Sequence, residues 1–274
     1  MDISSSTSDQ RIHAQRWADD VAGTVHATCN QVWGGIQSED LNARTSAVAV
    51  SLFSSPCEGG KGGDIYYLSV CREDLLTRIA LVDVIGHGPT VSNVSCWLYD
   101  CMAARINDGS GNGLLADLNT LASEYGEQAM ATAAIVAFYR GNSHLYFAYA
   151  GHPPALICRG PGCQWEVVSL KSESSLANLP LGVDLHCAFD QEAMPLGCGA
   201  RLFLYTDGLL EAPDAHGRLL GLESLVRLLN ERWDNSVADL KRRVRQALER
   251  HTAGIWNHDD VTFMGLEVIS SHPD

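Results

Sequence analysis

The stretch Leu202-Phe-Leu-Tyr-Thr-Asp-Gly-Leu-Leu-Glu211 decides the fold, because it joins an apolar run to a carboxylate at the point where the chain turns. Leucine and aromatic residues in such a run are typical of a buried strand, and Asp207-Gly208 marks its end. The stretch therefore predicts an aspartate held at the rim of a protein core.

The same combination of strand and aspartate recurs three times. Asp83 lies at the end of an apolar run, Asp259 and Asp260 precede another, and Asp64 opens a third. Carboxylates gathered at one rim repel one another unless cations lie between them. Hard divalent ions prefer such oxygen ligands, so these strand ends predict a metal site.

Length and charge narrow the class of protein. With 274 residues and 46% hydrophobic content, the chain can bury the core of one domain. Its formal net charge of -14 argues against a nucleic acid or an anionic membrane surface as the main partner.

The cysteines and the N-terminus indicate a cytoplasmic protein. The nine cysteines are odd in number and contain no Cys-x-x-Cys pair, which favours reduced thiols over a disulfide framework. The first ten residues are polar, and no apolar run reaches the length of a membrane span. We therefore expect neither export nor membrane insertion.

The chain divides into a short N-terminal part and one large domain. We expect residues 1–34 to form a disordered tail followed, from about residue 11, by an amphipathic helix with Ile12 and Trp17 on one side. This helix is interpreted as a docking element for a regulatory partner or a second copy. Residues 35–270 form the expected main domain.

Hydrophobic periodicity predicts the elements of the main domain. The expected strands cover residues 46–53, 65–71, 78–85, 132–139, 144–149, 155–158, 165–170, 185–189, 202–206 and 261–268. The expected helices cover residues 89–107, 114–125, 222–233 and 237–251. Strands first, paired helices inserted and strands again indicate an α+β fold with helices covering the sheet faces.

Six short motifs resemble a known family. They are Gly62-Gly-Asp64, Asp83-Val-Ile-Gly-His-Gly88, Ala150-Gly-His-Pro-Pro154, Leu179-Pro-Leu-Gly182, Tyr205-Thr-Asp-Gly-Leu-Leu-Glu211 and Asp259-Asp-Val-Thr262. In this order they resemble the SpoIIE/RsbU branch of the PPM-type, metal-dependent serine/threonine phosphatases, over about residues 45 to 269. The resemblance implies two packed antiparallel sheets flanked by helices, an α-β-β-α sandwich. It also implies two Mn²⁺ or Mg²⁺ ions and a phosphoserine or phosphothreonine protein as substrate.

The resemblance assigns a role to each motif residue. Asp83 corresponds to the aspartate that bridges both metals, and the backbone carbonyl of Val84 to the adjacent ligand. Asp64 would serve the second metal, while Asp207 and Asp259 would hold the first. A hydroxide bridging the two ions would then attack phosphorus directly, with Asp83 and Asp207 as the catalytic pair.

Further residues are expected to support the site. Asp260 is expected to stabilise the ligands rather than bind metal, and Gly86 and Gly208 to permit tight turns. His87 is interpreted as structural, as is His152, although both follow a glycine and invite a role as general acid.

Two interpretations of the role of Lys61 are open. It is either a solvated loop lysine or a contact for the substrate phosphate, since a cation here precedes Gly62-Gly63-Asp64.

The resemblance implies that the substrate is an anti-anti-sigma-factor-like protein in a bacterial partner-switching pathway. Two alternatives remain open. One is a degenerate phosphatase domain that binds a phosphoprotein without turning it over, and the other is a hydrolase of small phosphate esters. The presence of all four aspartates weighs against the first.

Overall fold

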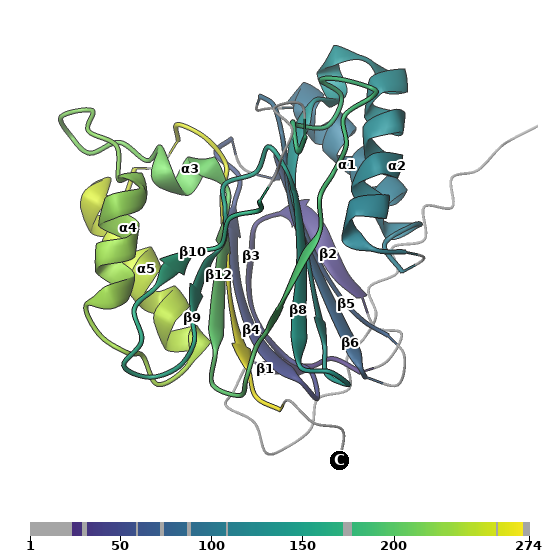
Figure 1. The fold of residues 1–274 in the computed structure, drawn as a ribbon. Coiled ribbons are helices and arrows are strands. Elements are labelled where there is room, and N and C mark those ends of the chain that lie inside the picture. The colour runs from purple at the N-terminus through teal and green to yellow at the C-terminus, as the bar shows by residue number, and fades with distance from the viewer. Residues whose placement is uncertain are drawn as a thin grey trace, which may run out of the picture.

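Two β-sheets pack face to face, and a pair of helices covers the outer face of each sheet (Figure 1). The computed structural model describes residues 24–28, 32–58, 60–71, 74–86, 89–107, 109–171, 177–255 and 257–270. This α-β-β-α arrangement confirms the predicted fold class.

The first sheet has seven strands in the order β1-β3-β4-β13-β12-β9-β10. Their bounds are β1 Thr24–His26, β3 Glu39–Arg44, β4 Val48–Ser55, β13 Val261–Val268, β12 Arg201–Tyr205, β9 Leu156–Cys158 and β10 Glu166–Val167. Neighbouring strands are antiparallel except β1 and β3. The strands β13 and β12, which lie in the middle of this sheet, come from the C-terminal third of the chain. The sheet is therefore complete only when this last part of the chain has joined it.

The second sheet has six antiparallel strands in the order β11-β8-β7-β6-β5-β2. Their bounds are β11 Glu192–Pro195, β8 His144–Ala150, β7 Ala131–Tyr139, β6 Leu76–Val84, β5 Lys61–Cys71 and β2 Val32–Gln37. Four of them, β5 to β8, were predicted from the sequence with small shifts of their ends.

The helices form the outer layers. Those beside the second sheet are α1 Pro89–Ala103 and α2 Gly111–Tyr125, followed by the short η1 Glu127–Ala129. Those beside the first sheet are α4 Gly221–Asn230 and α5 Val237–His251, preceded by the single turn α3 Asp207–Leu210.

Strand β6 shows why the apolar runs in the sequence are continuous. Ile79 and Leu81 lie in the core between the sheets, whereas Ala80 and Val82 pack against the layer of α1 and α2. Successive side chains of a strand point to opposite faces, so a strand covered on both faces needs apolar residues at every position. The helices are therefore required to bury the apolar side chains on the outer face of the sheet.

Two predicted elements are wrong. The helix predicted over residues 11–34 is replaced by strands β1 and β2 from residue 24 onward, and its earlier part lies outside the described residues. Strand β1 pairs with β3 and strand β2 pairs with β5, so the sheets include residues before the predicted boundary at 35. This strand pairing overrides the helical spacing of the apolar residues. The strand predicted over residues 185–189 is a turn with one isolated bridge at Ala188.

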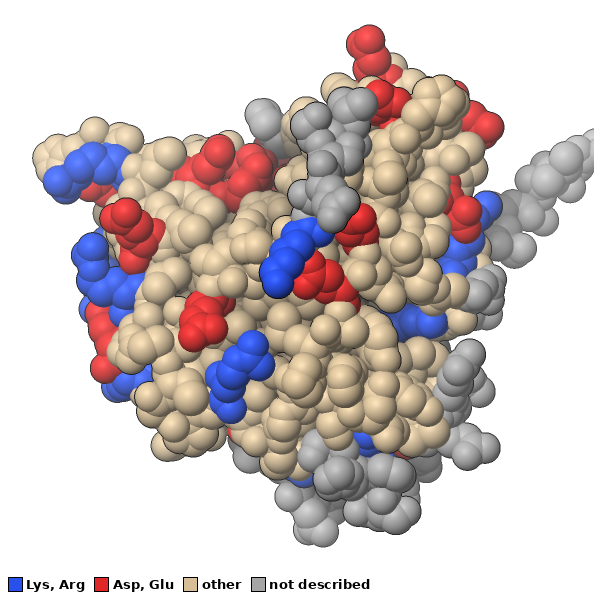
Figure 2. All heavy atoms as spheres, viewed as in Figure 1, with Lys and Arg blue, Asp and Glu red and all other residues tan. Residues whose placement is uncertain are grey.

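No helix in the described ranges has the length and apolar character needed to cross a membrane. On the face shown in Figure 2, Lys and Arg side chains are scattered, whereas acidic side chains gather near α3.

Candidate metal centre

The second sheet places two aspartates directly opposite each other. Asp64 on β5 and Asp83 on β6 are paired in register, so their side chains share the face that carries Ile79 and Leu81 between the sheets. Asp64 is 3% exposed and lies inside β5, because that strand starts at Lys61 rather than after the glycines.

The first sheet supplies the other two aspartates. Strand β12 ends just before Asp207, the first residue of α3, and β13 starts just after Asp259-Asp260. The strands are antiparallel neighbours, with Tyr205 opposite Phe263, so the end of one lies beside the start of the other.

The four predicted aspartates converge at this rim. Burial raises the pKa of Asp83 well above its usual range, and the negative charges of Asp64, Asp207 and Asp259 raise it further. Burial likewise raises the pKa of Asp64 to about 8, and the pKa of Asp259 is raised by burial and by Asp207 and Asp260. The site is thus electrostatically unfavourable when it holds only carboxylates.

A buried hydroxyl network fixes Asp64. The Thr206 hydroxyl donates to Asp64 Oδ2 at 2.9 Å and accepts from the Thr262 backbone N–H at 3.1 Å. The Thr262 hydroxyl lies 2.9 Å from that of Ser54 on β4. Because these groups come from the residue after β12 and from β13 and β4, the network joins the first sheet to an aspartate of the second.

Asp260 uses both carboxylate oxygens on backbone groups. Its Oδ1 accepts from the Cys57 N–H at 2.7 Å, and its Oδ2 accepts from the Gly63 N–H. It is 4% exposed. The structure therefore places Asp260 as a link between the loop after β4, the start of β5 and the start of β13.

The glycines at this rim permit close approach of backbone segments. A Cβ on Gly62 would lie 2.3 Å from Asp260 Oδ2, and one on Gly63 would lie 2.9 Å from the Val84 carbonyl oxygen. The Val84 carbonyl thus faces the start of β5, beside Asp64. Gly86 has φ +104°, a conformation that favours glycine, two residues after β6 ends.

The remaining predicted residues are placed as follows. Lys61 is exposed, and its Nζ lies 3.5 Å from Cys96 Sγ on α1, so its role toward a phosphate stays a hypothesis. His87 lies outside the described residues. His152 is 6% exposed, its Nδ1 lies 2.9 Å from the Pro153 carbonyl oxygen, and burial lowers its pKa to about 4, which keeps the ring neutral.

Sequence reasoning missed His258, Ser54 and the roles of the two threonines. His258 Nε2 lies 2.8 Å from the Gly208 carbonyl oxygen and so ties the residue before Asp259 to the residue after Asp207. Thr206 and Thr262 occur inside the quoted motifs, which was a signal for them. His258 and Ser54 lie outside every motif, and only the folded chain brings them to the site.

The donor set fits hard divalent cations in its chemistry. Carboxylates from both sheets and one backbone carbonyl are oxygen ligands, and their mutual repulsion is relieved when cations lie between them. Among the described side chains, no three His, Cys, Asp or Glu are arranged to hold a single ion. The carboxylates are instead distributed over the ends of strands from both sheets.

The metal-free protein is expected to lose stability as the pH rises. Between about pH 4 and about pH 8, the folded chain binds a proton on Asp64 that the unfolded chain has released, because folding raises the pKa of Asp64 to about 8. The raised pKa of Asp83 acts in the same direction. Stability falls with rising pH wherever the folded state binds more protons. Thermal unfolding in EDTA should therefore show a lower Tm at pH 8 than at pH 5, by roughly 2–4 °C for each kcal/mol. Saturating Mn²⁺ should flatten this slope, and a metal-free Tm that stays constant or rises would contradict the electrostatic account.

Comparison with known proteins identifies the family of this chain. Residues 74–269, more than half of the chain, match the family model described as "Stage II sporulation protein E (SpoIIE)". The chain belongs to the SpoIIE family. Asp83, Asp207 and Asp259 of this SpoIIE domain fall within the match, whereas Asp64 precedes it.

A curated relative is the phosphoserine phosphatase RsbP of Bacillus subtilis, which is 26% identical over 213 residues. The match covers 75% of this SpoIIE-family chain and 49% of RsbP, so the chain spans about half the length of that relative.

Solved structures share the fold of the SpoIIE domain. The SiaA-PP2C domain of Pseudomonas aeruginosa superposes with a TM-score of 0.68 at 19% identity, covering 80% of this chain and 85% of that one. RsbX, solved in complex with magnesium, superposes with a TM-score of 0.62 at 15% identity, covering 84% of this chain and 100% of that one.

Proposed function

We propose that this SpoIIE-family chain is a metal-dependent protein phosphatase that hydrolyses phosphoserine or phosphothreonine. The observation that carries the proposal is the convergence of Asp64 and Asp83 from one sheet with Asp207 and Asp259 from the other. Such a cluster costs stability in the absence of cations, so it is explained by the ions that it would hold.

The residues divide between two ions. Asp83 would be shared, with Asp64 and the Val84 carbonyl on the side of one ion and Asp207 and Asp259 on the side of the other. Because no three described carboxylates are arranged around a single ion, these side chains would draw together when the ions bind. When bound, Mn²⁺ or Mg²⁺ lowers the pKa of coordinated water and neutralises charge on phosphoryl oxygens.

The chain's own residues orient this site and keep it open on one side. The Thr206 hydroxyl fixes the Asp64 carboxylate, which is buried. Asp83 and Asp259 are partly exposed, so a phosphate group can reach them from solvent. Burial, with the Asp260 carboxylate beside it, raises the pKa of Cys57 to about 11, so this thiol stays protonated and is a poor nucleophile.

The substrate class follows from the relatives. RsbP is named a phosphoserine phosphatase, and another structure with this fold, from Mycobacterium tuberculosis, contains RsbU and RsbW domains in Rv1364c. These relatives favour a phosphorylated anti-anti-sigma-factor-like protein of a cytoplasmic partner-switching pathway as the substrate. The eight described cysteines are all free, which is compatible with a reducing compartment.

Hydrolysis of p-nitrophenyl phosphate tests the proposal. The purified chain is expected to turn over this ester with Mn²⁺, to stop when EDTA is added and to recover when Mn²⁺ is restored. Asp207→Asn should remove the turnover, since Asn carries no charge to hold an ion. A folded chain that is inactive with every divalent metal would favour the phosphoprotein-binding module instead. Rapid turnover of metabolite esters without activity on any phosphoprotein would favour the small-ester hydrolase.

A further inference from the structure

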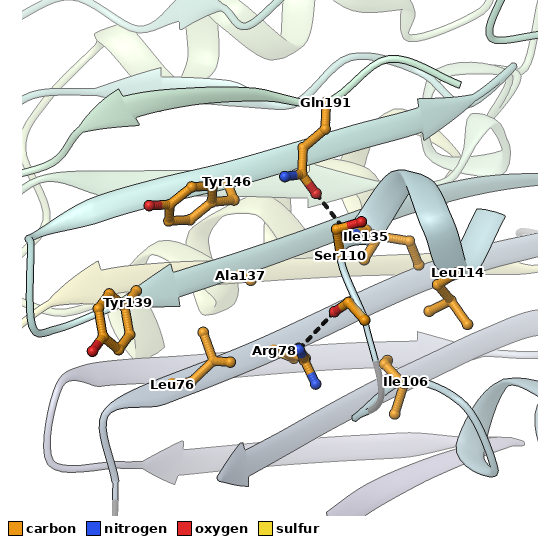
Figure 3. Close-up of a pocket in the computed structure, with 12 residues that line it drawn as sticks. Leu76, Arg78, Ile106, Ser110, Leu114, Ile135, Ala137, Tyr139, Tyr146 and Gln191 are labelled. Carbon is orange, nitrogen blue, oxygen red and sulfur yellow. Dashed lines mark hydrogen bonds between the residues drawn. The ribbon is translucent and has the colours of Figure 1, made fainter. Parts of the chain in front are cut away.

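A cavity lies on the outer face of the second sheet, away from the carboxylates. It has a volume of about 210 Å³ and lies where the turn between α1 and α2 crosses β6, β7 and β8 (Figure 3). One of its lining residues, Arg78, is five residues from Asp83 along β6, which corresponds to roughly 17 Å in an extended strand. The cavity is therefore separate from the metal centre.

The walls of the cavity are mostly apolar and partly aromatic. Leu76, Ala137 and the rings of Tyr139 and Tyr146 lie toward one end (Figure 3). Ile106, Ile135 and Leu114 line the other. An apolar cavity of about 150 Å³ in another protein takes up benzene, so this volume accommodates one aromatic ring with a small substituent. Flanking tyrosine rings favour a planar guest, because offset or edge-to-face contacts stabilise aromatic pairs.

Two polar side chains enter the cavity from opposite sides of the turn over residues 109–111. Arg78, 9% exposed, donates from Nη2 to the Gly109 carbonyl at 2.8 Å. Gln191 accepts from the Gly111 N–H through Oε1 at 2.7 Å. That bond fixes the amide orientation, and the Nε2 of Gln191 has no hydrogen-bond partner among the described residues (Figure 3).

The polar groups favour a guest that accepts hydrogen bonds and carries negative charge. Among the described lining residues, Arg78 is the one with a formal charge and none is acidic. The fifteen-residue helix α2 also starts here, and its N-terminus adds partial positive charge.

We infer that this cavity is a binding site for a small aromatic carboxylate. The ring lies between Tyr139, Tyr146 and the floor at Ala137, and the carboxylate accepts from Gln191 Nε2 and faces the Arg78 guanidinium. This composition, an apolar pocket with a few convergent polar groups, is typical of small-molecule sites. The inference does not depend on phosphatase activity.

Titration of the metal-free, ¹⁵N-labelled chain with benzoate tests the inference. Saturable shifts of the Gly109 and Gly111 amide signals are expected, with a Kd on the order of 1 mM, as befits a fragment of this size. Benzyl alcohol, which has the same ring without the charge, should bind at least about fivefold more weakly, because it cannot form charge-assisted hydrogen bonds.

Two variants locate the binding site, and a third variant serves as the control. Ala137→Leu fills the floor and should weaken benzoate binding at least about tenfold, because the added side chain occupies the volume of the ring. Ala49→Leu in β4, equally part-exposed but on the other sheet, should leave it unchanged. Gln191→Glu keeps the acceptor for Gly111 but replaces the amide donor with a negative charge, so it should weaken benzoate far more than benzyl alcohol.

Absence of saturable shifts in the wild type up to about 20 mM, a concentration well above that expected Kd, would overturn the inference. So would benzoate binding that Ala137→Leu leaves intact, or benzyl alcohol binding as tightly as benzoate. Each outcome is measured without metal or turnover, so it is distinct from failure of the proposed phosphatase activity.

Discussion

Asp83→Asn is expected to abolish turnover while making the metal-free protein more stable. Activity with Mn²⁺ should fall by at least about 10³-fold, equivalent to about 4 kcal/mol, because the shared ligand of both ions loses its charge. In EDTA, however, Tm should rise. Asp83 lies near three other carboxylates, and its raised pKa means that its ionised form is disfavoured in the folded state.

The opposite signs of these two effects make the prediction specific. Calorimetric titration with Mn²⁺ should show loss of binding, and Mn²⁺ should no longer raise Tm. Asp117→Asn on α2, which removes the charge of an exposed aspartate, is the matched control and should change neither quantity. An Asp83→Asn protein that is active, or less stable than the wild type in EDTA, would refute the role assigned to Asp83.

Gly208→Ala is expected to damage the fold and the site together. A Cβ at this position would lie 1.9 Å from the backbone carbonyl oxygen of Asp260, so α3 and the segment before β13 would have to separate. Overpacking of this kind costs roughly 1–3 kcal/mol or more. Because Asp207 and Asp259 flank the clash, Mn²⁺ affinity should fall at least about tenfold as well.

Gly265→Ala in β13 is the control for this substitution. Its Cβ would meet Val237 at 3.5 Å, an ordinary van der Waals distance, so stability and metal affinity should stay close to those of the wild type. Urea unfolding and calorimetric titration measure the two quantities. Equal stability of the Gly208→Ala and Gly265→Ala proteins would show that the segments separate freely, contrary to the structure.

The two elements that were predicted wrongly show where local sequence patterns do not determine the secondary structure. Residues 24–26 and 32–37 form edge-region strands, and their pairing with β3 and β5 replaces the helix that their apolar spacing predicted. Residues 185–189 alternate like a strand but form a turn, because Asn119 on α2 accepts from the Gly182 N–H and donates to the Asp184 carbonyl. In both cases partners distant in sequence decide the conformation.

The sequence by itself determined the continuous apolar strands, the helices α1, α2, α4 and α5, and the aspartates at strand ends. These features follow from periodicity and turn chemistry, which act within a few residues. Only the tertiary structure decided that Asp64 lies opposite Asp83, that Asp260 bonds to backbone groups of two other segments, and that His258 links α3 to the segment before β13. Those contacts join residues up to 203 positions apart, and register between sheets has no local signal in the chain.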